Sequence, residues 1–151
     1  VLTCVADLSS NCFVVHWVNL AQRLSIDVYP PFLKLRMAWN YGVNFGLFAE
    51  DNDLTRWVLI TVALIISVAV FWWISREEPS TPGRISAGLL VGGALGNVID
   101  RVIYGAVADF LNMSCCGFNN PFSFNIADIA VFIGAVGLVL FTSGETEQNP
   151  S

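Results

Sequence analysis

Histidine and charged side chains are scarce in this sequence. One His is present among 151 residues, and Asp, Glu, Lys and Arg together make up 13% of them, whereas a soluble domain carries about 25%. One His and four Cys offer no spacing typical of a metal site, so we expect no metal ion. The seven basic residues form no patch and the net charge is −5, which argues against a nucleic-acid partner.

Apolar residues are abundant instead. They account for 55% of the chain, and the mean hydropathy is +0.64, a composition that indicates a membrane protein. The length corresponds to one domain, so we expect a single membrane-embedded domain over residues 1–151. The sequence starts at Val1 without a basic flank. We therefore expect no cleavable signal peptide and a first span that lacks its opening residues.

Four apolar stretches are candidate membrane spans. The clearest is Arg56 to Ile74, about 19 residues long with Trp near both ends, as in an aromatic belt. Ser86 to Tyr104 is rich in small residues that let helices approach closely, and Ala127 to Thr142 is a shorter run. Val1 to Leu20 contains polar residues that would have to face other helices. We therefore predict a mainly α, integral membrane fold with four transmembrane helices.

A polar insertion at about residues 21–53 separates the first two spans. Within it, Phe32 to Trp39 alternates bulky apolar residues with Lys34 and Arg36, which is typical of a strand. Asn40-Tyr41-Gly42 then has the composition of a turn. We predict a small extramembrane β-sheet here, followed later in the chain by a loop over Asn112 to Ser123 and an unstructured polar tail over residues 143–151.

The four cysteines fall into two kinds. Cys4 and Cys12 lie in the first apolar stretch and are expected to be small apolar fillers. Cys115 and Cys116 are neighbours in the loop before the last apolar run; if this loop lies outside the cytoplasm, a disulfide is permitted there. Because adjacent cysteines bridge each other only with strain, we expect these two to stay unpaired.

Two acidic residues stand at the boundaries of consecutive apolar runs. Asp109 follows Ser86 to Tyr104, and Asp128 opens the last run. A carboxylate at the centre of a spanning helix costs roughly 2.5–3.5 kcal/mol and less near the interface. If both runs cross a bilayer, the connection between them lies on one side, and the two carboxyls come close together. Gly105 is well placed to end the helix and so free Asp109 from its register.

Close carboxylates have a characteristic chemistry. They cannot both ionise easily, so the pair shares a proton. In an aspartic protease one of them draws a proton from water while the other donates a proton to the scissile carbonyl. Asp7, Asp27 and Asp100 compete with Asp109 for partnership with Asp128; of these, Asp100 adjoins Arg101 and also fits a buried ion pair or helix packing.

These residues stand in short ordered motifs. They are Asn40 to Gly46, Gly96 to Arg101, Gly105 to Phe110 and Phe124 to Asp128. Together they resemble the signature boxes of the lipoprotein signal peptidase (signal peptidase II) family. That family also carries an Asp-Gln-x-Ser/Thr-Lys box in its first helix, which Asp7 and Ser10 match while Leu8 and Asn11 depart from it.

The resemblance implies a role for each motif residue. It makes Asp109 and Asp128 catalytic, and it places Asn40 and Gly42 in a substrate cradle, although Asn40 also fits a simple turn former. It implies that Asn97, Arg101 and Asn125 orient the substrate or polarise its carbonyl, unless they are only interhelical hydrogen-bond partners. Structural support for the site is expected from Asp7 and Asp100. The lone His16 is expected to be interfacial or packed rather than catalytic.

The resemblance also implies the reaction. The substrate would be a prolipoprotein cut just before a diacylglyceryl-modified cysteine, with no cofactor, by a monomer among the lipids of the bacterial inner membrane. The active site would face the periplasm, although counting Arg and Lys alone would place the 21–53 insertion in the cytoplasm. Two other classes stay open: a proton-coupled carrier that uses Asp100, Arg101 and Asp128, and a lipid transferase, for which the single His leaves no clear general base.

Overall fold

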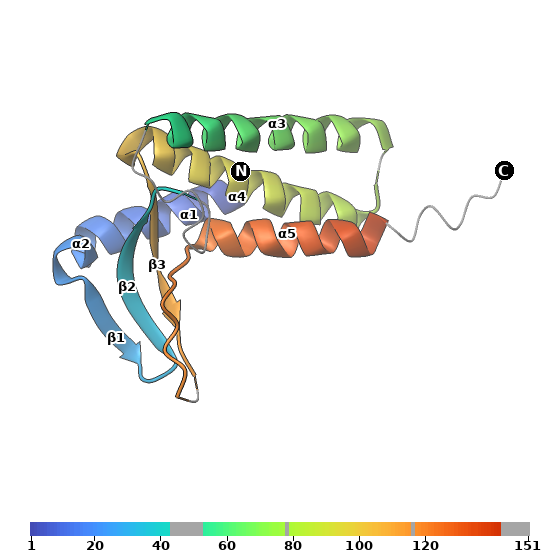
Figure 1. Cartoon of the computed structure of the whole chain (residues 1–151). Helices are drawn as coiled ribbons and strands as arrows, with labels where there is room; N and C mark the ends of the chain where they lie inside the picture. Colours follow the sequence, from blue (N-terminus) through green and yellow to red (C-terminus); the bar gives the residue numbers. More distant parts are fainter. Residues whose placement is uncertain (43–52, 78, 116, 143–151) are drawn as a thin grey trace.

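The computed structural model describes residues 1–42, 53–77, 79–115 and 117–142. Helix α1 (Leu2–Cys12) runs on into the π-helix η1 (Phe13–Trp17) and is followed by the short α2 (Leu20–Arg23). The long helices are α3 (Asp53–Glu77), α4 (Thr81–Tyr104) and α5 (Ile126–Thr142), and the strands are β1 (Ser25–Tyr29), β2 (Leu33–Asn40) and β3 (Val107–Met113). α4 packs between α3 and α5, and the sheet projects from one end of these helices (Figure 1).

The mainly helical character of the prediction is confirmed, whereas the number of spans is not. Among the described residues, α3 and α4 are long and apolar enough to cross a membrane, and α5 is a shorter apolar helix of 17 residues. α3 exposes large apolar side chains over most of its length, among them Trp57, Val62, Ile65 and Phe71. Such a helix is suited to lipid rather than to water.

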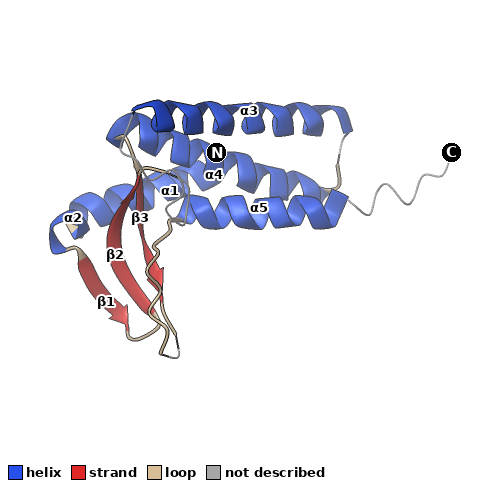
Figure 2. Cartoon of the chain, in the orientation of Figure 1, coloured by secondary structure: helices blue, strands red, loops and turns tan. Residues whose placement is uncertain are grey.

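The strands form one antiparallel sheet in the order β1-β2-β3 at the end of the helices (Figure 2). The predicted strand at Phe32 to Trp39 is confirmed as β2. Its alternation is interrupted, because the β2–β3 register shifts between Leu35 and Ala38. Leu35 and Met37 pack against the core cluster of Val14, Leu20 and Phe110. Trp39 contacts Tyr104 instead, with 5.7 Å between the ring centroids.

Strand β3 corrects the prediction for the connection between α4 and α5. We expected a loop from Asn112 onward, but β3 extends to Met113 and pairs with β2 along its length. Most of β3 is buried on both faces, so its sequence lacks the alternation of apolar and polar residues that marks a strand with one exposed face. Its hydrogen-bonding partner β2 is remote in sequence, and only folding brings the two together.

The close packing of α4 against α5 depends on glycine. A Cβ added at Gly93 would lie 2.5 Å from the carbonyl oxygen of Ala127, and one added at Gly134 would lie 2.5 Å from the backbone nitrogen of Leu90. Neither backbone atom can move aside without moving its helix. Gly93 and Gly134 therefore set the distance between α4 and α5.

A pair of glycine substitutions on α4 tests this dependence. We expect Gly93→Ala to destabilise the protein by about 1–3 kcal/mol through overpacking, because its Cβ meets the backbone of α5. Gly88→Ala is the matched control, since a Cβ there meets nothing within 4 Å, and both changes gain the same helix propensity. Thermal unfolding in detergent micelles measures the difference; equal melting temperatures for the two variants would contradict the packing argument.

Candidate active site

Asp109 reaches the site because α4 ends where the sequence predicted. Gly105 takes the left-handed conformation with φ +80° and donates its N–H to the carbonyl of Arg101, which ends the helix. Asp109 then lies on β3 opposite Ala38 of β2 and is only 2% exposed. Asn40, two residues beyond Ala38, lies on the same face of the sheet. Its amide donates a hydrogen bond of 3.0 Å to Oδ2 of Asp109.

Asp128 is held by the start of α5. The side chain of Asn125 accepts the N–H of Asp128 at 2.8 Å, and the carboxylate of Asp128 accepts the N–H of Asn125 at 3.4 Å. This reciprocal arrangement is a capping box, which satisfies amides that the first turn of a helix leaves open. The motif Phe-Asn-Ile-Ala-Asp therefore fixes both the start of α5 and the direction of the Asp128 side chain.

Backbone hydrogen bonds join the strand of Asp109 to the segment that leads to Asp128. The N–H groups of Phe110 and Leu111 both donate to the carbonyl of Phe124, at 3.1 and 2.8 Å. The N–H of Phe124 donates in return to the carbonyl of Leu111 at 3.0 Å. The residue after Asp109 is thus tied to the residue before the capping box, which brings the two acidic residues together.

The surroundings of Asp109 favour its neutral form. Burial first, and then the negative charge of Asp128, raise the pKa of Asp109 to about 8 against the opposing effects of the Asn40 hydrogen bond and Arg101. Asp100 adds a smaller upward contribution. At neutral pH Asp109 is therefore protonated while facing the carboxylate of Asp128, which is the division of roles that a proton-sharing pair requires.

Asn97 and Arg101 border the pair from α4. Asn97 donates to Oδ1 of Asp128 at 3.1 Å and accepts from the side chain of Asn125 at 3.1 Å. Arg101 donates to the carbonyl of Gly42 at 2.8 Å and to the carbonyl of Asn97 at 3.3 Å. Asn97 and Arg101, four residues apart, lie on one face of α4. Asn40 also forms the predicted turn, by accepting the N–H of Gly42 at 3.1 Å.

Asp7 and Asp100 lie beneath this layer and are fully buried. Asp7 accepts the N–H of Ala127 at 3.0 Å, and Asp100 accepts the N–H of Ala108 at 3.3 Å. The amide of Asn11 donates to Asp100 at 2.7 Å and to Asp7 at 3.4 Å. The sequence left two roles open for Asp100, a buried ion pair with Arg101 or helix packing. Its hydrogen bonds to Asn11 and Ala108 fit helix packing and not an ion pair. In the sequence, Asn11 stands out only as a departure from the family motif. Its spacing of four residues from Asp7 nevertheless indicates that the two side chains share one face of the helix.

Other residues named from the sequence lie elsewhere. Asp27 is on β1 in an exposed ion pair with Lys34, at 3.4 Å, and His16 is exposed on η1. Cys4 and Cys12 are free, but Cys115 is disulfide-bonded, so the expectation of an unpaired thiol there is wrong. The neighbouring Cys116, residues 43–46 of the Asn40 motif and the tail at 143–151 lie outside the described residues.

A cavity of about 340 Å³ opens beside Asp128. Its polar side chains are those of Asn40, Asn97, Arg101 and Asp128, and the rest of its lining is apolar. The apolar part comes mainly from α3 and α4: Leu59, Val62, Ala63, Ile66, Leu90 and Ala94. An extended apolar peptide segment could lie here with one backbone carbonyl at the acidic pair.

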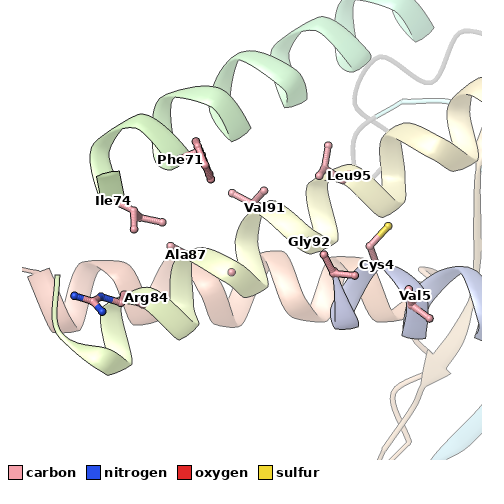
Figure 3. A pocket seen from close by; sticks show the side chains of 11 residues that line it. Cys4, Val5, Phe71, Ile74, Arg84, Ala87, Val91, Gly92 and Leu95 are labelled. Carbon is pink, nitrogen blue, oxygen red and sulfur yellow. The ribbon is translucent and has the colours of Figure 1, made fainter. Parts of the chain in front are cut away.

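A second cavity of similar volume lies between α1, α3 and α4 and is drawn in Figure 3. Its lining includes Cys4, Phe71, Val91 and Leu95, with Arg84 at one end and no carboxylate. It offers no group able to activate water. The cavity beside Asp128, which has a carboxylate in its lining, is therefore the better candidate for the active site.

Replacing Asp109 should make the protein more stable in a pH-dependent way. Between an ordinary Asp pKa of about 4 and the folded value of about 8, the unfolded chain loses a proton that the folded chain keeps, so folding weakens as pH rises. Asp109→Asn removes this effect. We expect its melting temperature to exceed that of the parent by more at about pH 8 than at about pH 5. Asp27→Asn, at an exposed position, is the control, and a pH-independent difference for Asp109→Asn would refute the assignment.

Comparisons with known proteins identify relatives of this chain. Residues 1–143 match the family described as Signal peptidase (SPase) II. A lipoprotein signal peptidase of Methylobacterium sp. (strain 4-46) is 38% identical over 140 residues, covering 93% of this chain and 83% of that protein. One of Methylorubrum extorquens (strain PA1) is 40% identical over 121 residues, covering 80% and 70%. One of Caulobacter vibrioides is 36% identical over 149 residues, covering 98% and 85%.

Two solved structures, each described as a bacterial membrane enzyme, share the fold. The first has a TM-score of 0.82 at 24% identity and covers 99% of this chain and 88% of its own. The second has a TM-score of 0.73 at 25% identity, with coverage of 92% and 86%. Because the family match spans nearly the whole sequence and the named relatives match most of their own length, this chain belongs to the signal peptidase II family of membrane proteases.

Proposed function

We propose that this protein removes the signal peptide from lipid-modified prolipoproteins, with Asp109 and Asp128 as its proton-sharing catalytic pair. The observation that carries this proposal is a pair of acidic residues in which burial, together with the nearby charge of Asp128, raises the pKa of Asp109 to about 8, with Asp128 lining an apolar cavity. Family membership supplies the substrate class. The cut falls immediately before a diacylglyceryl-modified cysteine, and the reaction uses neither metal nor organic cofactor.

The first step adds water to the scissile carbonyl. The carboxylate of Asp128 takes a proton from a water molecule, whose oxygen forms a bond to the carbonyl carbon. The protonated Asp109 donates its proton to the carbonyl oxygen, so no full negative charge develops there. Asn97 and the N–H of Asn125 both donate to Asp128, which orients the carboxylate that receives the proton.

The second step breaks the peptide bond. The tetrahedral carbon expels the nitrogen of the lipidated cysteine, and Asp128 gives that nitrogen the proton it had taken from water. The hydroxyl formed from the carbonyl returns its proton to Asp109 as the new carboxyl group forms. Asp109 is then protonated and Asp128 ionised, as at the start, and one water has been consumed for each bond cut.

The remaining polar residues fit roles in holding the peptide. Asn40 fixes Asp109 and shapes the turn at Gly42, and Arg101 holds that turn to α4. A peptide backbone lying over the cavity would meet Asn40, Arg101 and Asn97 along one wall. Asn125 contributes through Asn97, whose oxygen it holds.

The proposed membrane arrangement follows the lipid on the substrate. α1 with η1, α3, α4 and α5 would span the bacterial inner membrane, with the sheet and both acidic residues at its periplasmic face. The diacylglyceryl tails then stay in the bilayer while the peptide bond reaches the site at the interface. Because one chain supplies both acidic residues, a monomer suffices, with membrane lipids against the exposed apolar face of α3.

Removing either acidic residue should abolish cleavage. We expect Asp109→Asn and Asp128→Asn each to lower the rate by at least about 10³-fold, because each loses one proton transfer of the pair. The assay incubates purified protein with a diacylglyceryl-modified precursor and follows the mobility shift on a gel. Asp27→Asn should cleave at the parental rate. Normal cleavage by either site variant would refute the pair, and an inactive parent would favour the carrier class.

The rate of cleavage should fall at alkaline pH. The reaction needs the proton on Asp109, whose pKa is raised to about 8, so that proton is present below this pH and lost above it. We therefore expect kcat/KM, which reports the pKa values of the free enzyme, to decline as pH rises through about 8. Steady-state rates across the pH range check this, with melting curves at each pH to exclude unfolding. A rate that held constant well above this pH would contradict a protonated Asp109.

A further inference from the structure

Helix α1 places one neutral side chain between two buried carboxylates. Asp7 and Asp100 are fully buried, and Asn11 is 2% exposed. The Asn11 Nδ2 atom lies 2.7 Å from Oδ2 of Asp100 and 3.4 Å from Oδ2 of Asp7. Both neighbours are carboxylate oxygens, so the amide must turn its donors toward them. Its own oxygen then has no hydrogen-bond partner among the described residues.

Each of these carboxylates holds the backbone one residue before a catalytic position. Asp7 accepts the N–H of Ala127, which precedes Asp128. Asp100 accepts the N–H of Ala108, which precedes Asp109. The contacts are matched: a carboxylate from one helix, a backbone amide, and then the acidic residue that follows that amide in the chain.

We propose that Asn11 is a positioning residue of the active site, whose amide joins Asp7 to Asp100 and thereby fixes the spacing between the backbones of Asp128 and Asp109. The inference rests on the proposed function and adds a residue that touches neither substrate nor catalytic carboxyl. The chain of contacts runs from β3 through Asp100, Asn11 and Asp7 to the first turn of α5.

The surrounding packing leaves little room for the side chains of Asp7, Asn11 and Asp100 to move. A Cβ added at Gly96 would lie 2.7 Å from Oδ2 of Asp7, so α4 closes directly over that carboxylate. Because neither carboxylate contacts water, neither can replace the Asn11 hydrogen bonds with solvent. Loss of the amide therefore leaves two buried acceptors that can separate, and the peptide segments bonded to them move with them.

Three substitutions at one position distinguish this role. Asn11→Leu keeps the size and removes the donors, and Asn11→Asp keeps the shape and replaces donors with acceptors. Asn11→Lys restores a donor in the form of a cation between two carboxylates. We expect Asn11→Leu to lower kcat by at least about tenfold with KM within about twofold, because a displacement of about 1 Å is costly to catalysis. Asn11→Asp should be lower still, and Asn11→Lys should recover most of the loss.

A pH profile separates positioning from general stability. Asp109 faces Asn40 from β2, Asp128 from α5, and Arg101 and Asp100 from α4. If Asp7 and Asp100 separate, Asp109 and Asp128 move apart and the charge of Asp128 raises the pKa of Asp109 less. The alkaline limb of kcat/KM, which reports the free enzyme, then shifts to lower pH. The control is Ser67→Ala, which removes a buried hydrogen bond to Ala63 within α3 and should leave the limb in place.

The outcomes are separable. A parental kcat and an unmoved limb in Asn11→Leu would overturn the proposal, as would a lower melting temperature with neither kcat nor limb changed. If the parent itself cleaves nothing, the proposed function fails instead. The positioning role of Asn11 is then tested by ¹³C NMR titration of the Asp109 carboxyl carbon in the parent and in Asn11→Leu. A lower titration midpoint in the variant supports this role, and an unchanged midpoint refutes it.

Discussion

The structure depends on keeping buried carboxylates supplied with hydrogen-bond donors. Asp7, Asp100 and Asp109 are almost completely inaccessible to water, and a buried carboxylate without partners costs several kcal/mol or takes up a proton. The donors here are mainly amides, from Asn11, Asn40 and the backbone N–H groups of the neighbouring elements. Amides orient a carboxylate without cancelling its charge, so proton sharing remains available where Asp109 meets Asp128.

These donor contacts also explain how elements distant in sequence come to one place. Asp7 lies near the start of the chain and accepts an amide at the start of α5, and Asp100 reaches from α4 to the beginning of β3. Asp7 satisfies an amide in the first turn of α5, which no bond within that helix reaches, and Asp100 accepts an amide of β3. Asp7 and Asp100 thus support the segments that carry the two proposed catalytic residues, of which Asp128 lines the cavity.

The sheet has a comparable positioning role. β2 brings Asn40 to Asp109, and the hydrogen bonds between Leu111 and Phe124 carry the path of β3 toward α5. The cavity beside the acidic pair is mostly apolar, which suits a signal peptide and keeps the pair in a poorly solvated environment. The apolar lining of this cavity comes mainly from the surfaces of α3 and α4.

The sequence by itself determined the local features. Apolar runs predicted α3, α4 and α5, the alternation at Phe32 to Trp39 predicted β2, and Gly105 predicted the end of α4, because each depends on contacts within a few residues. The motif residues likewise pointed to Asp109 and Asp128. Only the tertiary structure decided what depends on remote partners. β3 has no alternating pattern because both its faces are buried, and Asn11 acquires its role only when α4 brings Asp100 alongside Asp7.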